Sequence, residues 1–325
     1  MELTDTFGRT INYLRLSVTD RCNMRCVYCM PAGGIPMLAH DAILSYEELL
    51  LIAQTAVAAG IEKIRVTGGE PLVRKGIIPF LARLASISGL RELVLTTNGL
   101  QLREMAESLR QAGVQRLNIS LDSLRPEIFA DITRGGDVHR VMAGIAAAER
   151  AGFPLKINVV VMRGINDQEI LDFAALTLDR PLTIRFIEYM PAIRSDDWES
   201  RIVPGETILD RIGQRFSFTP LERDGLAGPA RTFRIDGAAG TIGVITPVFG
   251  HFCGECNRIR VTATGRARSC LFSDTGVDLK PLLASGDEAG LAAALRAIVV
   301  QKPGRHSLAE TEQQYTPFVM SAIGG

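Results

Sequence analysis

The chain has 325 residues, of which 46% are hydrophobic and 22% are charged, as in ordinary globular proteins. This length suits one large α/β domain, or one domain with a smaller appendage. The 36 basic residues equal the 36 acidic ones, so the net charge of zero argues against a general affinity for nucleic acid or anionic membranes.

The first residues lack the basic and apolar parts of a secretory signal, and no uninterrupted apolar run is long enough to span a membrane. We therefore expect a cytoplasmic protein, whose thiols stay reduced. The six cysteines fall as two triplets, one toward each end of the chain. This distribution favours metal binding over disulfide formation.

The first predicted strand covers residues 13–18 and leads into the first cysteine triplet. Leu14 and Leu16 alternate with Arg15, so the arginine lies on the opposite face of the strand from the leucines. The segment that follows has a C-x3-C-x2-C spacing and reads Cys22-Asn-Met-Arg-Cys26-Val-Tyr28-Cys29.

Three thiolates on one short loop can hold a metal centre from one side. A structural zinc ion usually takes four protein ligands, and an iron–sulfur cube usually takes four cysteines. Three ligands would leave one metal corner open for chemistry. The alternative, that these cysteines are neighbours by chance, is disfavoured by the spacing and by the preceding strand.

Strands and helices then alternate through the next part of the chain. Ser45 and Glu48 form a capping box at the start of a helix. Further strands are expected at 61–67, 91–96, 115–120, 155–161 and 182–188, and further helices at 76–86, to about 112, to 152 and at 168–178. The valines of 155–161 suggest a strand buried on both faces.

Six strands alternating with helices predict a parallel sheet with right-handed crossovers. A closed barrel needs eight strands, so we expect an open, partial (β/α)6 barrel that resembles part of a TIM barrel. The polar and glycine-rich motifs GGEP, TTNG, SLDS and EYMP each follow a strand. Since the carboxyl ends of parallel strands share one edge, these motifs and the cysteine loop should form one binding rim.

The alternation stops near residue 204. A helix at 204–216, strand-like runs near Phe218, Phe233 and Gly243, and two helices within 279–300 predict a small α+β unit. We expect a core domain at 1–200 and a C-terminal domain at 201–325, separated by a polar loop at 194–199.

The second triplet consists of Cys253, Cys256 and Cys270, and it leaves two interpretations open. His251 could complete a structural Cys3His zinc site. Alternatively, the triplet could bind a second iron–sulfur cluster with its own open iron. Arg258 and Arg260 favour the cluster beside a nucleotide, because side chains two apart on a strand share a face and guanidinium groups bind phosphate.

The motifs together resemble the radical S-adenosylmethionine superfamily and, within it, the GTP 3′,8-cyclase family of molybdenum cofactor biosynthesis. The resemblance runs from about Leu14 to Gly325 and is carried by CNMRCVYC, KIRVTGGEPL, LTTNG, NISLDS, KINVVVMRGIND, IRFIEYMP and CGECNRIR, with the terminal Gly-Gly. It implies a partial-barrel core and a C-terminal domain that carries a second [4Fe-4S] cluster.

The resemblance also assigns roles to single residues. The ligands of the first cluster would be Cys22, Cys26 and Cys29, and those of the second would be Cys253, Cys256 and Cys270. S-adenosylmethionine would contact Tyr28, Gly69, Ser120 and Met190. GTP would contact Arg15, Arg65, Thr96, Lys156, Arg258, Ile259 and Arg260, with Arg185 as a further candidate. The terminal Gly324-Gly325 would reach into the active site.

The implied reaction is that of a radical lyase. An external one-electron reductant supplies the first cluster, S-adenosylmethionine yields methionine and a 5′-deoxyadenosyl radical, and this radical removes the C3′ hydrogen of GTP. Bond formation between C3′ and C8 then gives 3′,8-cyclo-7,8-dihydro-GTP, which passes to the next pathway enzyme, cyclic pyranopterin monophosphate synthase.

Two other functions compete with this interpretation. One is a peptide-modifying radical S-adenosylmethionine enzyme with an auxiliary cluster, and the other is a zinc-binding scaffold. The arginines beside the second triplet favour a nucleotide over a peptide. The sequence leaves open a monomer or a homodimer, the identity of the reductant, and the guanine atom that meets the second cluster.

Overall fold

The computed structural model describes residues 3–35, 38–190, 198–223, 225–273, 276–306 and 320–323. Six strands form the predicted parallel core, in the order of the chain. They are β1 (Tyr13–Ser17), β2 (Lys63–Thr67), β3 (Glu92–Thr97), β4 (Arg116–Ser120), β5 (Leu155–Val161) and β6 (Thr183–Glu188). The partial-barrel prediction is therefore confirmed.

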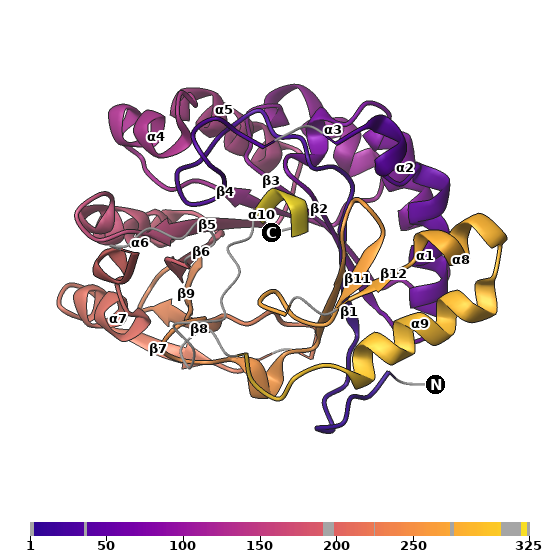
Figure 1. Ribbon diagram of the computed structural model, residues 1–325. Helices are drawn as coiled ribbons and strands as arrows, with labels where there is room; N and C mark the ends of the chain where they lie inside the picture. The colour runs from indigo at the N-terminus through magenta and orange to yellow at the C-terminus, as the bar shows by residue number, and fades with distance from the viewer. Residues whose placement is uncertain are drawn as a thin grey trace.

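Helices cover the outside of this curved sheet (Figure 1). They are α1 (Tyr46–Ala58), α2 (Ile77–Ala85), α3 (Leu102–Gln111), α4 (Pro126–Thr133), α5 (Val138–Arg150) and α6 (Ile170–Asp179). Short 3-10 turns occur at His40–Ala42, Pro71–Val73, Asp167–Glu169, Trp198–Arg201 and Cys253–Glu255. The predicted capping box of α1 is present, because Ser45 Oγ accepts from Glu48 N at 3.1 Å and Glu48 Oε2 accepts from Ser45 N at 2.6 Å.

The C-terminal part extends the same sheet at both edges. Its elements are α7 (Gly205–Gly213), β7 (Phe218–Leu221), β8 (Arg231–Ile235), β9 (Thr241–Ile245), β10 (Arg258–Val261), β11 (Arg266–Arg268), β12 (Val277–Asp278), α8 (Lys280–Ser285), α9 (Glu288–Val300) and α10 (Met320–Ile323). β9 pairs with β6 and β10 pairs with β1, both in parallel. One 12-stranded sheet results, in the order β12-β11-β10-β1-β2-β3-β4-β5-β6-β9-β8-β7.

Burial along β5 differs from the prediction of a strand buried on both faces. Leu155, Ile157, Val159 and Val161 are buried, whereas the alternate positions are half-buried. The first set packs in the hydrophobic core, and on the opposite face Asn158 and Val160 line an internal cavity. The valine run therefore reflects one core face and one cavity face, which periodicity in an apolar sequence cannot distinguish.

The C-terminal helix α10 lies across the open end of the barrel in the view of Figure 1. Its Met320 N–H donates to the carbonyl of Cys29 at 3.3 Å, and Ile323 is buried. Sequence near the end of the chain is thus brought onto the first cysteine loop. The predicted tail residues Gly324-Gly325 and most of the polar loop at 194–199 lie outside the described residues. No helix of the described part is long and apolar enough to cross a membrane.

Candidate active site

A cavity of about 260 Å³ opens at the carboxyl ends of the parallel strands. The cysteine loop and the four motifs after β2, β3, β4 and β6 all contribute to it, as the sequence predicted. The predicted site residues that line it are Arg15, Cys22, Cys26, Tyr28, Cys29, Arg65, Gly69, Thr96, Ser120, Arg185, Met190, Cys253, Cys256, Arg258, Arg260 and Cys270. Both cysteine triplets therefore face one space.

Two residues assigned to GTP do not line this cavity. Ile259 is 1% exposed, pairs with Leu14 in the sheet and packs in the core, so its side chain faces away from the site. Lys156 lies on β5 among other cations. Burial and then Arg185 and Arg116 lower the pKa of its ammonium group to about 6.

The first cysteine loop packs closely against the glycine motif after β2. Gly69 N donates to Thr19 O at 2.7 Å, and Glu70 N donates to Arg21 O at 2.8 Å. A Cβ at Gly69 would collide with the backbone of Arg21, so no larger residue fits here without moving the loop. The loop is also held by Arg134, the residue after α4, whose Nη1 donates to the carbonyls of Arg25 and Met30, both at 2.9 Å.

The thiols of this loop are buried in surroundings that disfavour free thiolates. Burial raises the pKa of Cys22, and burial together with Asp122 raises the pKa of Cys26. All six cysteines are free of disulfide bonds. A cationic iron–sulfur core would offset this cost of ionising the thiols, so the donor set fits a bound cluster.

Asp122 is a site residue to which the sequence analysis gave no role. Its Oδ2 accepts from the Tyr28 hydroxyl at 2.7 Å and its Oδ1 accepts from Val160 N at 2.8 Å. Burial raises the pKa of Asp122 to about 6. The contact fixes the Tyr28 ring at the wall of the cavity, and the SLDS motif after β4 was the available signal for it.

Asn98 and Glu70 connect the neighbouring motifs, and neither was among the predicted site residues. Glu70 accepts from Asn98 N at 2.6 Å and from Thr97 Oγ1 at 2.8 Å, and burial raises its pKa to about 7. Asn98 Nδ2 approaches Cys22 Sγ at 3.9 Å. These bonds hold the loop after β3 against the first cysteine loop.

The surroundings of the second triplet favour a thiolate more than those of the first triplet do. Burial alone would raise the pKa of Cys256, but Arg258 and Lys302 outweigh it and lower that pKa to about 6. Arg258 Nη2 lies 3.8 Å from Cys256 Sγ. Cations next to a thiolate are the setting in which cysteine binds metal near neutral pH.

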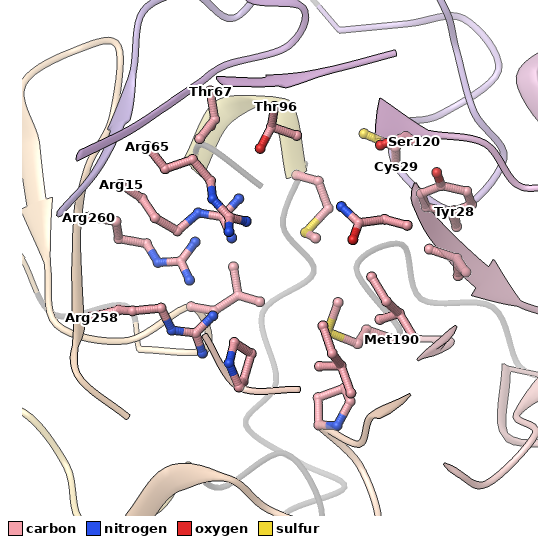
Figure 2. Close-up of a pocket in the computed structure, with 18 of the residues that line it drawn as sticks. Arg15, Tyr28, Cys29, Arg65, Thr67, Thr96, Ser120, Met190, Arg258 and Arg260 are labelled. Carbon is pink, nitrogen blue, oxygen red and sulfur yellow. The ribbon is translucent and has the colours of Figure 1, made fainter. Parts of the chain in front are cut away.

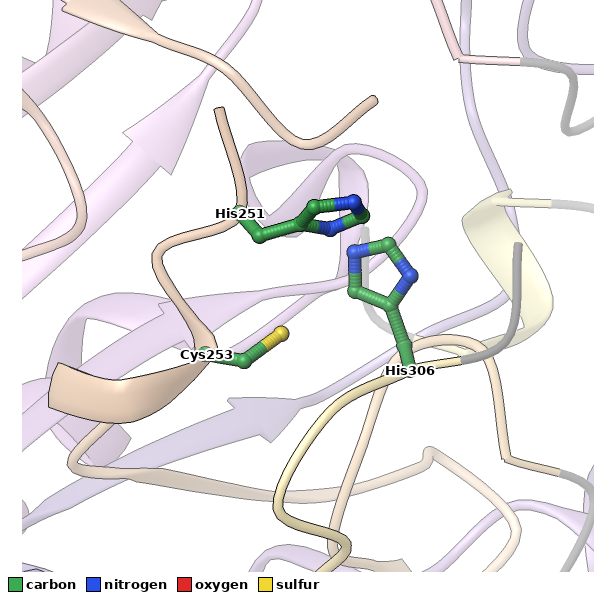
Figure 3. A group of neighbouring side chains, drawn as sticks. All are labelled: His251, Cys253 and His306. Atoms are coloured by element: carbon green, nitrogen blue, oxygen red, sulfur yellow. The ribbon is translucent and has the colours of Figure 1, made fainter. Parts of the chain in front are cut away.

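Figure 3 shows His251, Cys253 and His306 together, with their ligand atoms all within 4.8 Å of one another. Cys256 and Cys270 do not belong to this group. A single zinc ion held by the predicted Cys3His set would need those four ligand atoms close together. The described residues therefore do not assemble that zinc site, and no signal in the sequence pointed to His306.

Arginines form one wall of the cavity (Figure 2). Arg260, Arg15 and Arg65 occupy matching positions on the adjacent parallel strands β10, β1 and β2. Neighbouring strands lie about 5 Å apart, so the like charges of arginines at matching positions repel one another. Within the described residues, Arg65, Arg185, Arg258 and Arg260 form no ion pair with a carboxylate.

Polar atoms along this wall lack partners. Arg65 Nε, Arg260 Nη1 and Thr96 Oγ1 are buried without a hydrogen-bond partner in the described part of the chain. Buried polar atoms and buried charges are costly unless a partner satisfies them. The wall is therefore complementary to a polyanion, and several phosphate groups would satisfy it.

The opposite wall has a different chemistry. In Figure 2, Cys29, Tyr28 and Ser120 lie across the cavity from the arginines. The arrangement can hold one ligand against the first cysteine loop and an anionic ligand against the arginines, in direct contact with each other.

The fold and this site define a radical S-adenosylmethionine protein. The family model "Radical SAM superfamily" matches residues 16–177, and the model "Molybdenum Cofactor Synthesis C" matches residues 182–308. The chain is 65% identical to the GTP 3′,8-cyclase of Geobacter sulfurreducens, with 100% of both chains covered. It is 48% identical to that of Moorella thermoacetica, with 99% of this chain and 100% of the relative covered. The chain therefore belongs to the GTP 3′,8-cyclase family.

Solved structures confirm the fold at much lower identity. Streptococcus suis SuiB bound to S-adenosylmethionine matches with a TM-score of 0.61 and 14% identity, over 90% of this chain and 69% of that one. The native anSMEcpe structure with bound AdoMet matches with a TM-score of 0.54 and 14% identity, over 81% and 75%. At this identity the likeness describes the architecture and not the substrate.

Proposed function

We propose that this protein is a GTP 3′,8-cyclase. It converts GTP and S-adenosylmethionine to (8S)-3′,8-cyclo-7,8-dihydroguanosine 5′-triphosphate, L-methionine and 5′-deoxyadenosine, the first step of molybdenum cofactor biosynthesis. The observation that supports this most directly is one cavity that is lined by both cysteine triplets and by a wall of arginines. The full-length identity to the Geobacter relative supports the same assignment.

Cys22, Cys26 and Cys29 would hold the first [4Fe-4S] cluster, which with S-adenosylmethionine supplies a carbon-centred radical when bound. The chain's part is to place that ligand. Tyr28, which Asp122 fixes, and Ser120 line the part of the cavity beside the first cysteine loop. Gly69 and Met190, the other two residues assigned to S-adenosylmethionine, line the same cavity.

The arginine wall would bind the triphosphate of GTP. A triphosphate carries close to four negative charges, and several converging cations offset the cost of removing it from water. Arg15, Arg65 and Arg260 supply three such cations from adjacent strands, and Arg185 and Arg258 supply two more. Cys253, Cys256 and Cys270 would hold a second [4Fe-4S] cluster near Arg258, where the guanine base is expected.

The protein's contribution to the chemistry is positioning and exclusion of water. A carbon-centred radical attacks any close C–H bond, so the ribose C3′ must be the nearest one. Anchoring the phosphates on one wall and the base at the second triplet fixes the ribose between them. Met320 of α10 also lines the cavity and narrows its open end.

Turnover with isotope labelling tests this function. The anaerobically reconstituted protein is incubated with dithionite, S-adenosylmethionine and GTP deuterated at C3′. We expect deuterium in 5′-deoxyadenosine and formation of the 3′,8-cyclo product. With all three of Cys253, Cys256 and Cys270 changed to alanine, iron should fall from about eight to about four per chain, and the cyclic product should be lost. A colourless protein containing zinc and no iron would refute the proposal.

The competing peptide-modifying function lacks support at the site. An elongated peptide carries few charges in a defined row, whereas the cavity presents five arginines. Cleavage of S-adenosylmethionine that does not depend on GTP, without any cyclic product, would favour the peptide function instead.

The reaction also requires partners outside the chain. An external one-electron reductant must supply the first cluster, and the product must pass to a cyclic pyranopterin monophosphate synthase. The six free cysteines favour a reducing compartment, so we place the protein in the cytoplasm.

A further inference from the structure

Two buried basic residues contact the second cysteine triplet without belonging to the cavity lining. Arg9 is 8% exposed and Lys302 is 3% exposed. Neither is among the residues that face the substrate cavity. They come from opposite ends of the chain, Arg9 from the segment before β1 and Lys302 from the segment after α9. Both donate hydrogen bonds to backbone carbonyls around the cysteines.

Lys302 connects the two segments that carry Cys256 and Cys270. Its Nζ donates to the carbonyl of Arg258 at 2.8 Å and to the carbonyl of Ser269 at 2.8 Å. Ser269 directly precedes Cys270, and Arg258 lies two residues after Cys256. Cys256 also acts electrostatically on this ammonium group. One side chain therefore fixes the spacing between two of the three cysteines.

The charge of Lys302 has no carboxylate partner among the described residues. A buried ammonium group is costly unless an anion lies close to it, and two neutral carbonyl groups do not supply one. The nearest anions would be the thiolates of Cys256 and Cys270, which act on it electrostatically. A cluster bound by three thiolates carries a net negative charge, so it would complete the ion pair.

Arg9 holds the third cysteine of the triplet. Its Nη1 donates to the carbonyl of Cys253 at 2.5 Å, and its Nη2 donates to the carbonyl of Pro303 at 2.8 Å. Asp5 pairs with Arg9 Nε at 2.5 Å and neutralises it locally. Because Pro303 follows Lys302, the two cations secure one short segment against all parts of the triplet. Arg9 therefore positions the backbone without adding net charge, whereas Lys302 adds a positive charge that no carboxylate of the described residues neutralises.

We infer that Lys302 is a positioning residue for the second cluster, and that its buried positive charge raises the reduction potential of that cluster. Reduction adds a negative charge, so a fixed cation nearby stabilises the reduced form more than the oxidised form. Arg9 supports the same loop through its backbone. The inference rests on the proposed function in one respect, which is that the second triplet binds an iron–sulfur cluster.

The test isolates the second cluster. In a parent protein of full length, Cys22, Cys26 and Cys29 are changed to alanine, so that only the second triplet can bind iron. Lys302→Met, Lys302→Gln and Lys302→Arg are then introduced separately. Iron and sulfide per chain and a reductive titration followed by electron paramagnetic resonance are measured after anaerobic reconstitution.

Removal of the charge should shift the potential to more negative values. Lys302→Gln keeps a hydrogen-bond donor without the charge, so it should retain most of the iron and show the negative shift. Lys302→Met should show the same shift or lose the cluster, about four irons per chain. Lys302→Arg should restore both the iron content and the potential. Unchanged iron and unchanged potential in both neutral variants would overturn the inference.

Lys280 provides a matched control. Its Nζ also donates to two carbonyl groups, those of Asp41 at 3.1 Å and Ala42 at 2.7 Å, but it lies outside the cavity lining. Lys280→Met should change neither iron content nor potential. An equal shift in Lys280→Met and Lys302→Met would show a general loss of packing and refute a specific role for Lys302.

The parent protein separates the two hypotheses. If it binds no iron, the second cluster and that part of the proposed function are wrong, and Lys302 has no cluster to support. If it binds about four irons and the neutral Lys302 variants match it, only the inference about Lys302 fails.

Discussion

At the scale of single residues, the site is dominated by positive charge that the protein alone does not neutralise. Arg15 has an arginine at the matching position of each neighbouring strand, Arg260 on one side and Arg65 on the other. Side chains that repel one another destabilise a sheet unless a ligand of opposite charge binds between them. The arginine wall therefore lowers the stability of the free protein and favours the binding of a polyanion.

Arg260→Ala and Arg258→Ala should each weaken GTP binding. Loss of a charge-assisted hydrogen bond costs roughly 1.5–3 kcal/mol, or about one to two decades in affinity. Isothermal titration under anaerobic conditions measures the change. Arg234→Ala, an exposed position on β8, is the control and should bind GTP normally. Unchanged affinity in both site variants would remove these arginines from the GTP site.

Lys156 should couple GTP binding to proton uptake. Its pKa is lowered to about 6, so the free protein holds it mostly neutral above that pH. A bound triphosphate would raise this pKa, because it favours the charged form. The gain in GTP affinity from charged Lys156 is then complete below about pH 6, where the free protein already carries the charge. It is lost as the pH rises through the higher pKa of Lys156 in the complex.

Calorimetry of GTP binding at pH 7.5, in buffers with different heats of ionisation, measures this proton uptake. This pH is about 1.5 units above the lowered pKa of Lys156, so the free protein holds the side chain mostly neutral. Lys156→Met should remove one source of uptake and flatten the pH dependence of affinity. The same proton uptake in the variant and in the unchanged protein would show that Lys156 does not sense the ligand.

At the scale of elements, the first cysteine loop depends on a glycine in another loop. Gly69 lies against the backbone of Arg21, one residue before Cys22. The hydrogen bonds from Gly69 N and Glu70 N then hold the cysteine loop against the loop after β2. The sequence analysis assigned Gly69 to S-adenosylmethionine, and the structure adds the close approach of a second segment of backbone.

Gly69→Ala should therefore displace the first cysteine loop. Overpacking of this kind costs about 1–3 kcal/mol, and the loop is the part able to move. We expect reduced iron at the first cluster and weaker S-adenosylmethionine binding, while the second cluster remains. Gly33→Ala is the matched control, since a Cβ there meets nothing within 4 Å. Normal iron content and S-adenosylmethionine affinity in Gly69→Ala would contradict this account.

At the scale of the whole molecule, the two family regions share one sheet. β1 lies between β2 and β10, and β6 lies between β5 and β9. Without the C-terminal strands, both would become exposed edges of a largely apolar parallel sheet. The domain boundary proposed at residue 200 thus remains a prediction, with strand pairing across it on both sides.

A fragment of residues 1–203 should consequently aggregate or fold incompletely. Its β1 and β6 edges expose backbone groups that the intact chain pairs with β10 and β9. Size-exclusion chromatography and circular dichroism measure this. Co-expression with residues 204–325 should restore a discrete species of the full size. A monomeric, cooperatively unfolding fragment 1–203 would establish an independent core domain.

The sequence by itself determined the partial-barrel core, the cysteine loops and the rim on which they meet. These features are local: alternation defines strands such as β1, and parallel strands place the loops that follow them at one edge. Of the predicted contacts, Arg15 and Arg65 could be placed on the cavity face from the same alternation.

The tertiary structure alone decided how the two ends of the chain meet. The pairing of β10 with β1 aligns Arg260 with Arg15, and Lys302 and Arg9 reach the second triplet from distant segments. Nor could the sequence tell that Asp122 fixes Tyr28. Such contacts depend on long-range packing and on the energy of burying charge, and neither leaves a periodic pattern in the chain.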